Sequence, residues 1–272
     1  EPGTTDPKSV MISISPQVLC FQRKISYVKY TKKQRFSVTI AIMIKTNEIP
    51  LSVRNIAETL EQAGFEAYLI GGCVRDLLLK RAPKDWDFTT NANPDQIQDL
   101  FPDSFCNNEY GTVGVKNEEE SDETLKVVEI TPYRSEDGYS DARRPDKVTF
   151  GVSLEEDLAR RDFTVNAIAF RIKDEKIVDL YGGLEDLEAK RLKTVGNPDQ
   201  RFGEDALRMM RAVRLATELD FVIEGETIAG IVRNSELLQK IAIERICIEF
   251  IRIIDSKNPM QGIIFLEKLA LL

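Results

Sequence analysis

Two aspartates, Asp85 and Asp87, are the side chains of this chain best suited to metal chemistry. They open an apolar run that reads as a strand, where side chains two positions apart point to the same face. Two neighbouring carboxylates repel each other unless a cation lies between them. Mg²⁺ prefers a few rigid oxygen ligands together with substrate phosphates. The pattern therefore predicts a magnesium site at the start of this strand.

A glycine pair lies just before these aspartates. Gly71 and Gly72 follow the strand-like residues 68–70 and precede a short helical pattern. Glycines let the backbone turn sharply and approach a ligand, and the following helix offers free N–H groups to an anion. Arg75, in the first turn, can clamp a phosphate through two N–H groups. Alone, each pattern usually marks a turn or a solvated strand end; in this order they predict a triphosphate beside its metal.

The stretch from Leu69 to Thr90 resembles GGxVRDxLLxxxxxDxDxxT, the opening motif of the class II tRNA nucleotidyltransferase and bacterial poly(A) polymerase family. The resemblance implies an α+β fold, in which a polymerase-β-like head, a small mixed sheet with helices, precedes an all-helical neck. It also implies that Asp85 and Asp87 are catalytic and bind two Mg²⁺ ions. Gly72 and Arg75 would hold the incoming nucleotide. Glu129, on a later predicted strand, is either a third acidic group facing this pair or an ordinary exposed residue.

A second motif covers Arg160–Ala167, which matches the RRDFTxNA box of the same family. The resemblance implies that Arg161 contacts the nucleotide phosphates and that Asp162 and Asn166 contact the ribose. A 2′-hydroxyl both donates and accepts hydrogen bonds, so an Asp or Asn can hold it and favour ribonucleotides. Taken alone, the segment reads as a helix with surface arginines.

The polar segment 134–150 lies between these two motifs. Its composition predicts a flexible surface loop. It also resembles the family segment YRxDGxYxDxRRPxxVxF, the loop that the resemblance links to switching toward ATP. Its presence counts against an enzyme that adds only C.

A strong helical pattern from Glu204 to Leu219 carries the third group of charges. Spacings of three or four residues place Asp205, Arg208, Arg211 and Arg214 on one face of a helix. An Asp and an Arg held rigidly can bond the Watson–Crick edge of C or A, whereas G and U present the wrong pattern. The commoner meaning of such a pattern is a salt-bridged solvated face. The resemblance to the family element EDxxRxxRxxR favours a nucleotide-binding, base-selecting role.

Composition narrows the chemistry further. The 272 residues contain no histidine, which excludes histidine bases and histidine-ligated zinc. Four scattered cysteines lack metal spacing and indicate a reducing compartment. No apolar run is long enough for a membrane span. The net charge of −8 counts against a nucleic-acid partner, which normally requires a basic surface. The net charge does not, however, reveal local basic patches.

The sequence divides into a leader (1–44), a nucleotidyltransferase head (45–196) and a helical neck (197–272), after which the family's body and tail are missing. The leader reads as a disordered or artificially added segment before a natural start at Met43, with order expected only from Ile49. The alternative is a transit-like or nucleic-acid-binding arm. We expect an enzyme of the cytoplasm, or of an organelle if the leader is a transit segment.

The expected reaction is metal-dependent addition of C and A from CTP and ATP to tRNA 3′ ends. The alternatives are an A-only enzyme, a poly(A) polymerase, or a truncated nucleotide- or RNA-binding fragment without catalysis. The oligomeric state is not specified by the sequence.

Overall fold

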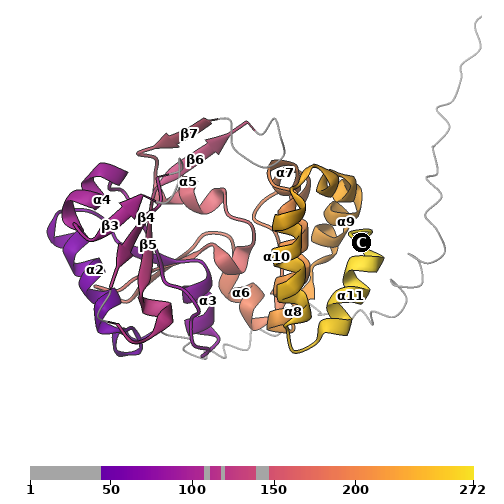
Figure 1. The fold of residues 1–272 in the computed structure, drawn as a ribbon, viewed down its shortest axis with the longest axis horizontal. Coiled ribbons are helices and arrows are strands. Elements are labelled where there is room, and N and C mark those ends of the chain that lie inside the picture. Colours follow the sequence, from indigo (N-terminus) through magenta and orange to yellow (C-terminus); the bar gives the residue numbers. More distant parts are fainter. Residues whose placement is uncertain (1–43, 107–110, 118–119, 139–146) are drawn as a thin grey trace, which may run out of the picture. The chain divides into compact units, whose positions relative to one another are not determined.

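The computed structural model describes residues 44–106, 111–117, 120–138 and 147–272. They belong to one compact unit built on a seven-stranded mixed sheet of order β3-β4-β5-β2-β1-β8-β9 (Figure 1). The strands β2 and β5 are parallel and all other neighbours are antiparallel. In sheet order the strands are β3 (Ser104–Cys106), β4 (Val113–Lys116), β5 (Val127–Pro132), β2 (Asp87–Thr90), β1 (Tyr68–Ile70), β8 (Ile168–Arg171) and β9 (Lys176–Asp179).

Five short helices belong to the sheet domain: α2 (Leu51–Gln62), α3 (Gly72–Leu78), α4 (Pro94–Leu100), α5 (Leu154–Ala159) and α6 (Gly183–Glu188). The apolar stripe of α2 is buried, as its periodicity predicts. The helix α5 begins with the predicted capping box between Ser153 and Glu156. The first motif spans β1, α3 and β2. The second begins at Arg160, the residue after α5, and contains the 3₁₀ helix η3 (Thr164–Asn166).

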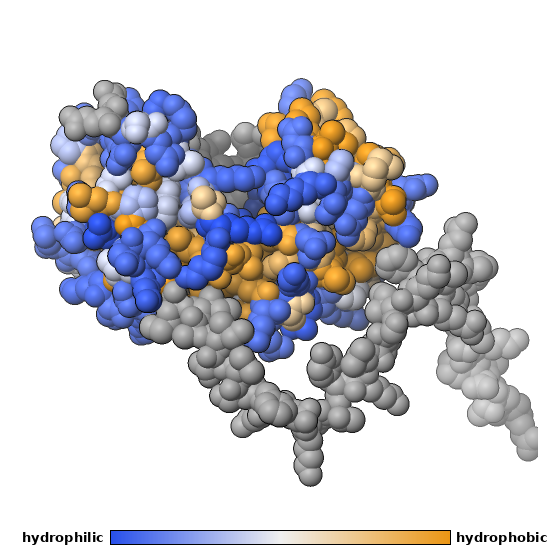
Figure 2. Space-filling model, turned by 90° about the horizontal axis from the view of Figure 1, so that it is seen from below, coloured by the Kyte–Doolittle hydropathy of each residue, from blue (hydrophilic) through white to orange (hydrophobic). Residues whose placement is uncertain are grey.

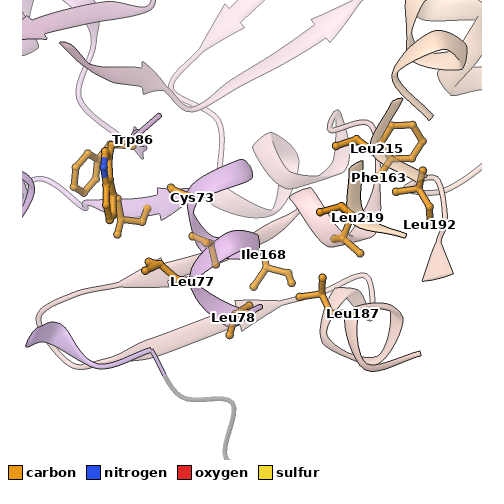
Figure 3. Packing of buried hydrophobic residues seen from close by; sticks show 14 of the residues in the cluster. Cys73, Leu77, Leu78, Trp86, Phe163, Ile168, Leu187, Leu192, Leu215 and Leu219 are labelled. Carbon is orange, nitrogen blue, oxygen red and sulfur yellow. The ribbon is translucent and has the colours of Figure 1, made fainter. Parts of the chain in front are cut away.

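The buried core is continuous from the sheet into the following helices. Figure 3 shows Leu77 and Leu78 of α3 between Trp86 on one side and Ile168 and Leu187 on the other. A further group, Phe163, Leu192, Leu215 and Leu219, belongs to the same cluster. Because Phe163 lies inside the second motif, that motif is fixed by apolar packing against the neck.

Two expectations about irregular segments are wrong. Ile44 is buried in the core and a 3₁₀ helix, η1 (Thr46–Glu48), follows it, so order begins before Ile49; residues 1–43 lie outside the described residues. The two ends of the segment 134–150, expected to be a surface loop, form an antiparallel pair, β6 (Arg134–Asp137) with β7 (Lys147–Phe150); residues 139–146 lie outside the described residues. The polar sequence did not predict this pairing, because a pair of strands that buries little apolar surface shows only a weak alternation of apolar residues.

The neck consists of α7 (Pro198–Glu204), α8 (Leu207–Leu219), α9 (Gly225–Asn234), the 3₁₀ helix η4 (Ser235–Lys240), α10 (Ile243–Ile254) and α11 (Pro259–Lys268). It is not purely helical, because β11 (Val222–Ile223) pairs in parallel with β10 (Arg191–Leu192). The expected single helix from Glu204 to Leu219 is broken at Asp205, whose backbone is extended. The boundary between head and neck at residues 196 and 197 stays a prediction.

Exposed hydrophobic side chains gather on the last two helices, including Ile243, Ile248, Ile251, Met260 and Ile264. Figure 2 shows broad hydrophobic areas on the neck side of the face it presents, and mainly hydrophilic residues on the sheet side. Within the described part of the chain, no helix has the length and apolar character of a membrane span.

Candidate active site

The glycine turn brings the predicted site residues together. Gly71 ends β1 with a φ of 78°, a conformation that side chains with a Cβ rarely adopt. A Cβ placed on Gly71 would lie 3.7 Å from Asp87 Oδ2 and 3.7 Å from Arg161 Nη1. A Cβ on Gly72 would lie 3.4 Å from Asp85 Oδ1. Both aspartates and the arginine of the second motif therefore converge on this turn.

The two aspartates reach the turn by different routes. Asp87 is the first residue of β2, opposite Glu129 on the parallel strand β5. Asp85 lies in the bend before β2 rather than on the strand, which corrects the expectation that both are strand residues. Their carboxylates nevertheless lie at adjacent residues of the same turn. The predicted pairing of the two acidic groups is present, although its local geometry differs from the one expected.

The electrostatics of the pair suit a cation. Burial, followed by the charges of Asp85 and Glu129, raises the pKa of Asp87 to about 7, against the opposing charge of Arg161. Repulsion of this kind is relieved when a divalent ion accepts both carboxylates as ligands. Within the described residues, no group of three or more acidic, histidine or cysteine side chains is arranged to hold a metal. The donor set of two carboxylates fits a metal that takes its remaining ligands from substrate. Glu129 lies opposite Asp87, and its role as a third ligand stays a prediction.

Arg161 and Arg75 border the turn in different states. Arg161 donates through Nη2 to Asp157 Oδ2 at 3.1 Å, and its buried Nε has no hydrogen-bond partner within the described residues. Arg75 is bound by Nε and Nη2 to Asp76 at 2.9 and 3.0 Å and by Nη1 to Asn166 at 2.8 Å. The geometry therefore presents Arg161 as the arginine with capacity for a ligand. A phosphate-binding role for Arg75 stays a prediction.

The two residues assigned to the ribose are buried and bonded to each other. Asn166 donates to Asp162 Oδ1 at 3.1 Å, and Asp162 Oδ2 accepts from Arg211 Nε and Nη2 at 2.9 and 2.6 Å. Burial opposes ionisation of Asp162, but the adjacent Arg211 outweighs it and holds the pKa of that carboxyl well below its usual range. Asp162 therefore joins the head to the neck. Contact of Asp162 and Asn166 with a ribose stays a prediction.

The charged residues of the neck do not share one open face. Asp205 precedes α8 and accepts from Arg245 at 2.9 Å. Arg208 donates to Glu204 at 2.7 Å and to the carbonyl oxygen of Arg160 at 3.1 Å. Asp205 and Arg208 thus lie near the second motif of the head, each held by a further charged residue. The expectation that all four charges project from one helix face is wrong, because the backbone breaks at Asp205.

Arg214 is a structural residue in this arrangement. It is 4% exposed and donates to Glu249 Oε2 at 2.5 Å and to Glu218 at 2.9 Å. A buried arginine with two carboxylate partners has little capacity left for a nucleotide. Its predicted nucleotide contact stays a prediction. So does that of Arg211, whose side chain is bound to Asp162 but 35% exposed.

Sequence reasoning missed Asp157, Arg245 and Glu249. Asp157 precedes Arg160 and Arg161 by three and four residues, a spacing typical of helical ion pairs, so this residue was within reach. Arg245 and Glu249 lie 40 and 35 residues from Asp205 and Arg214. No local sequence pattern predicts ion-pair partners that are so far apart in the chain.

Comparison with known proteins places this geometry in a family. Residues 67–193 match the poly(A) polymerase head domain, and residues 220–272 match the probable RNA- and SrmB-binding site of polymerase A. The chain belongs to the tRNA nucleotidyltransferase and poly(A) polymerase family, as the two motifs predict.

Relatives and solved structures agree with this assignment. A CCA-adding enzyme of Limosilactobacillus reuteri is 49% identical over 211 residues, which are 77% of this chain and 51% of that protein. The crystal structure of the Bacillus stearothermophilus CCA-adding enzyme with CTP is 37% identical with a TM-score of 0.72, covering 82% of this chain and 53% of the other. A tRNA nucleotidyltransferase complexed with a primer tRNA and an ATP analogue is 26% identical with a TM-score of 0.65, covering 80% and 61%. The chain thus spans about half the length of the first of these relatives.

Proposed function

We propose that this chain carries the catalytic head and base-selecting neck of an enzyme that adds C and A to tRNA 3′ ends from CTP and ATP. The observation that carries the proposal is the convergence of Asp85, Asp87 and Arg161 on the Gly71–Gly72 turn. The names of the relatives, CCA-adding enzymes, support the choice of reaction within the family.

Asp85 and Asp87 would hold the magnesium ions, which would supply activation of the RNA 3′-hydroxyl and neutralisation of the charge on the departing pyrophosphate. Arg161 would contact the triphosphate through Nη1, which lies beside the turn. The glycine backbone leaves room for the phosphates. These residues place the α-phosphate in line with the attacking hydroxyl, so positioning and charge neutralisation supply the catalysis.

Base selection falls to the junction between α7 and α8. Asp205 accepts from the exocyclic amine of C or A, while Arg208 donates to a ring nitrogen or carbonyl oxygen. Arg245 and Glu204 hold these two side chains by ion pairs at 2.9 and 2.7 Å. A rigid pair of this kind selects bases by hydrogen-bond pattern, because only C and A match an acceptor at Asp205 and a donor at Arg208.

The test is incorporation. A tRNA lacking its CCA end is incubated with the chain, Mg²⁺ and labelled CTP or ATP, separately and together, and the products are sequenced. Addition of two C residues followed by one A supports the proposal. Addition of A alone, or of a long A tract, would assign the chain to the other reactions of the family. Nucleotide binding without incorporation would instead identify a non-catalytic fragment.

A further inference from the structure

Asp157 is a fully buried carboxylate next to the proposed active site. Its Oδ1 accepts from Arg160 Nε and Nη2 at 2.9 and 2.6 Å. Its Oδ2 accepts from Arg161 Nη2 and Thr89 Oγ1, both at 3.1 Å. Burying a carboxylate is costly unless it is paired and hydrogen-bonded. Both oxygens of Asp157 are occupied by protein partners, so this residue organises its neighbours instead of binding a ligand.

The two arginines held by Asp157 differ in what else they contact. Arg160 also donates through Nη1 to Glu136 on β6 at 3.1 Å, so its guanidinium joins two carboxylates. Arg161 has Asp157 as its carboxylate partner, while its Nε is buried without a partner within the described residues. Its Nη1 lies 3.7 Å from the position of a Cβ on Gly71. Asp157 thus engages Nη2 of Arg161 and leaves Nη1 for the space beside the glycine turn.

Thr89 connects Asp157 to the strand that carries Asp87. Thr89 lies two residues after Asp87 on β2, so both side chains point to the same face of the sheet. Its hydroxyl proton is shared between Asp157 Oδ2 at 3.1 Å and the carbonyl oxygen of Thr131 at 3.2 Å. Asp157 therefore fixes Arg161 with respect to the strand of the proposed metal ligand, across 68 residues of sequence.

Without this anchor, the position of Arg161 would change for a simple electrostatic reason. Asp87 Oδ2 and Arg161 Nη1 each lie 3.7 Å from the position of a Cβ on Gly71. An arginine released from Asp157 would be attracted to that carboxylate, where its charge would compete with a metal ion. A long, flexible side chain also loses conformational freedom on binding a ligand unless it is already held in place.

We propose that Asp157 is a positioning residue that holds the Arg161 guanidinium beside Gly71, ready for the nucleotide triphosphate and away from Asp87. The inference rests on the proposed function, because it takes a triphosphate to be the ligand of this turn. Arg160, held by Asp157 and Glu136, serves as the structural member of the arginine pair.

A double-mutant cycle on nucleotide binding tests the proposal. The dissociation constant of CTP is measured by calorimetry with Mg²⁺ but without RNA, so that no turnover occurs, for Asp157→Asn, Arg161→Ala and the double variant. We expect Asp157→Asn to weaken CTP binding about tenfold, the effect of one charge-assisted contact. In the Arg161→Ala background the same change should have almost no further effect, because Asp157 acts through Arg161. Glu155→Gln, an exposed residue on the same helix, is the matched control.

Two further variants keep the test decisive. If Asp157→Asn fails to fold by circular dichroism, Thr89→Val removes one hydrogen bond to Asp157 while keeping all charges, and should weaken CTP binding about threefold. Unchanged CTP affinity in a folded Asp157→Asn or Thr89→Val, or additive losses in the double variant, would overturn the positioning role. Arg161→Ala with wild-type CTP affinity would also sink it. Failure of the wild-type chain to extend tRNA would count against the proposed function, while the binding cycle still reports on Asp157.

Discussion

The glycine turn and the neck both carry clustered charges, but the two clusters are built in opposite ways. At the turn, Asp85 and Asp87 approach each other and Arg161 keeps an unpaired Nε. In the neck, Arg211 and Arg214 each form close ion pairs with buried carboxylates. Like charges brought together without internal compensation indicate a place for a ligand, whereas complete pairs indicate structure.

The largest expected effect is the loss of activity when an aspartate of the glycine turn is replaced. Asp87→Ala should lower the rate of CMP addition by at least about a thousandfold, because a metal site with one carboxylate lost no longer supports the reaction. The fold should keep its stability, since the change removes a carboxylate that repels Asp85 and Glu129. Single-turnover incorporation and thermal unfolding measure the two effects, with exposed Asp99→Ala as the control. A wild-type rate of CMP addition in Asp87→Ala would contradict the contrast between turn and neck, because the turn would then not be a ligand site.

On the neck side, the effect should be on stability first. Arg214→Ala leaves buried Glu249 without its closest partner, which should cost about 3–5 kcal/mol of unfolding free energy. Urea unfolding measures this loss. Arg233→Ala provides a contrast, because Arg233 and Asp199 form an exposed pair and the unfolding free energy should hardly change. Equal losses in the two variants would contradict the view that burial sets the importance of each pair.

The sequence predicted the turn better than the neck, and the reason is physical. Gly71, Gly72, Asp85 and Asp87 lie within one strand–turn–helix–strand unit, where local rules fix how residues approach each other. The second motif pointed to Arg161, which the structure places beside the same turn, although its contact with the nucleotide stays a prediction. Even the break before β2 at Asp85 did not separate the two carboxylates.

The neck was beyond such rules because its charges have distant partners. Arg211 pairs with Asp162, 49 residues away, and Arg208 bonds the carbonyl oxygen of Arg160, 48 residues away. Helical spacing says which residues share a face, but not which tertiary partner neutralises them. Gly203 lies two residues before the break at Asp205, but an isolated glycine inside a helical pattern is tolerated and does not show where a helix ends. The spacing of the charged residues thus predicted the helix α8 but not the ion pairs that its side chains form.

The pH dependence of stability tests the ion pair of Asp162 and Arg211, which links the head to the neck. The pKa of Asp162 is held below its usual range chiefly by Arg211, which outweighs the opposing effect of burial. A carboxyl with a lowered folded-state pKa stabilises the fold above its unfolded pKa of about 3.9, and this contribution disappears as the pH falls toward the folded-state value. Between about pH 5 and pH 3 the wild type should lose about 1–2 kcal/mol more than Asp162→Asn. Urea unfolding at several pH values measures the difference, and parallel curves for the two proteins would contradict it.

The smallest expected effect is that of adding a methyl group at Gly71. A comparison with Gly64 separates backbone strain from crowding at the turn. Gly71 and Gly64 both have positive φ, at 78° and 88°, so alanine at either position should cost about 1–2 kcal/mol of stability. A Cβ at Gly64 meets nothing within 4 Å, whereas one at Gly71 lies 3.7 Å from Asp87 and Arg161, which is contact without overlap. Gly71→Ala should therefore also raise the KM for CTP a few-fold, while Gly64→Ala leaves it unchanged. If both variants kept the wild-type KM, the triphosphate would not approach the turn as closely as the charges around it indicate, and the unpaired Nε of Arg161 would need another ligand.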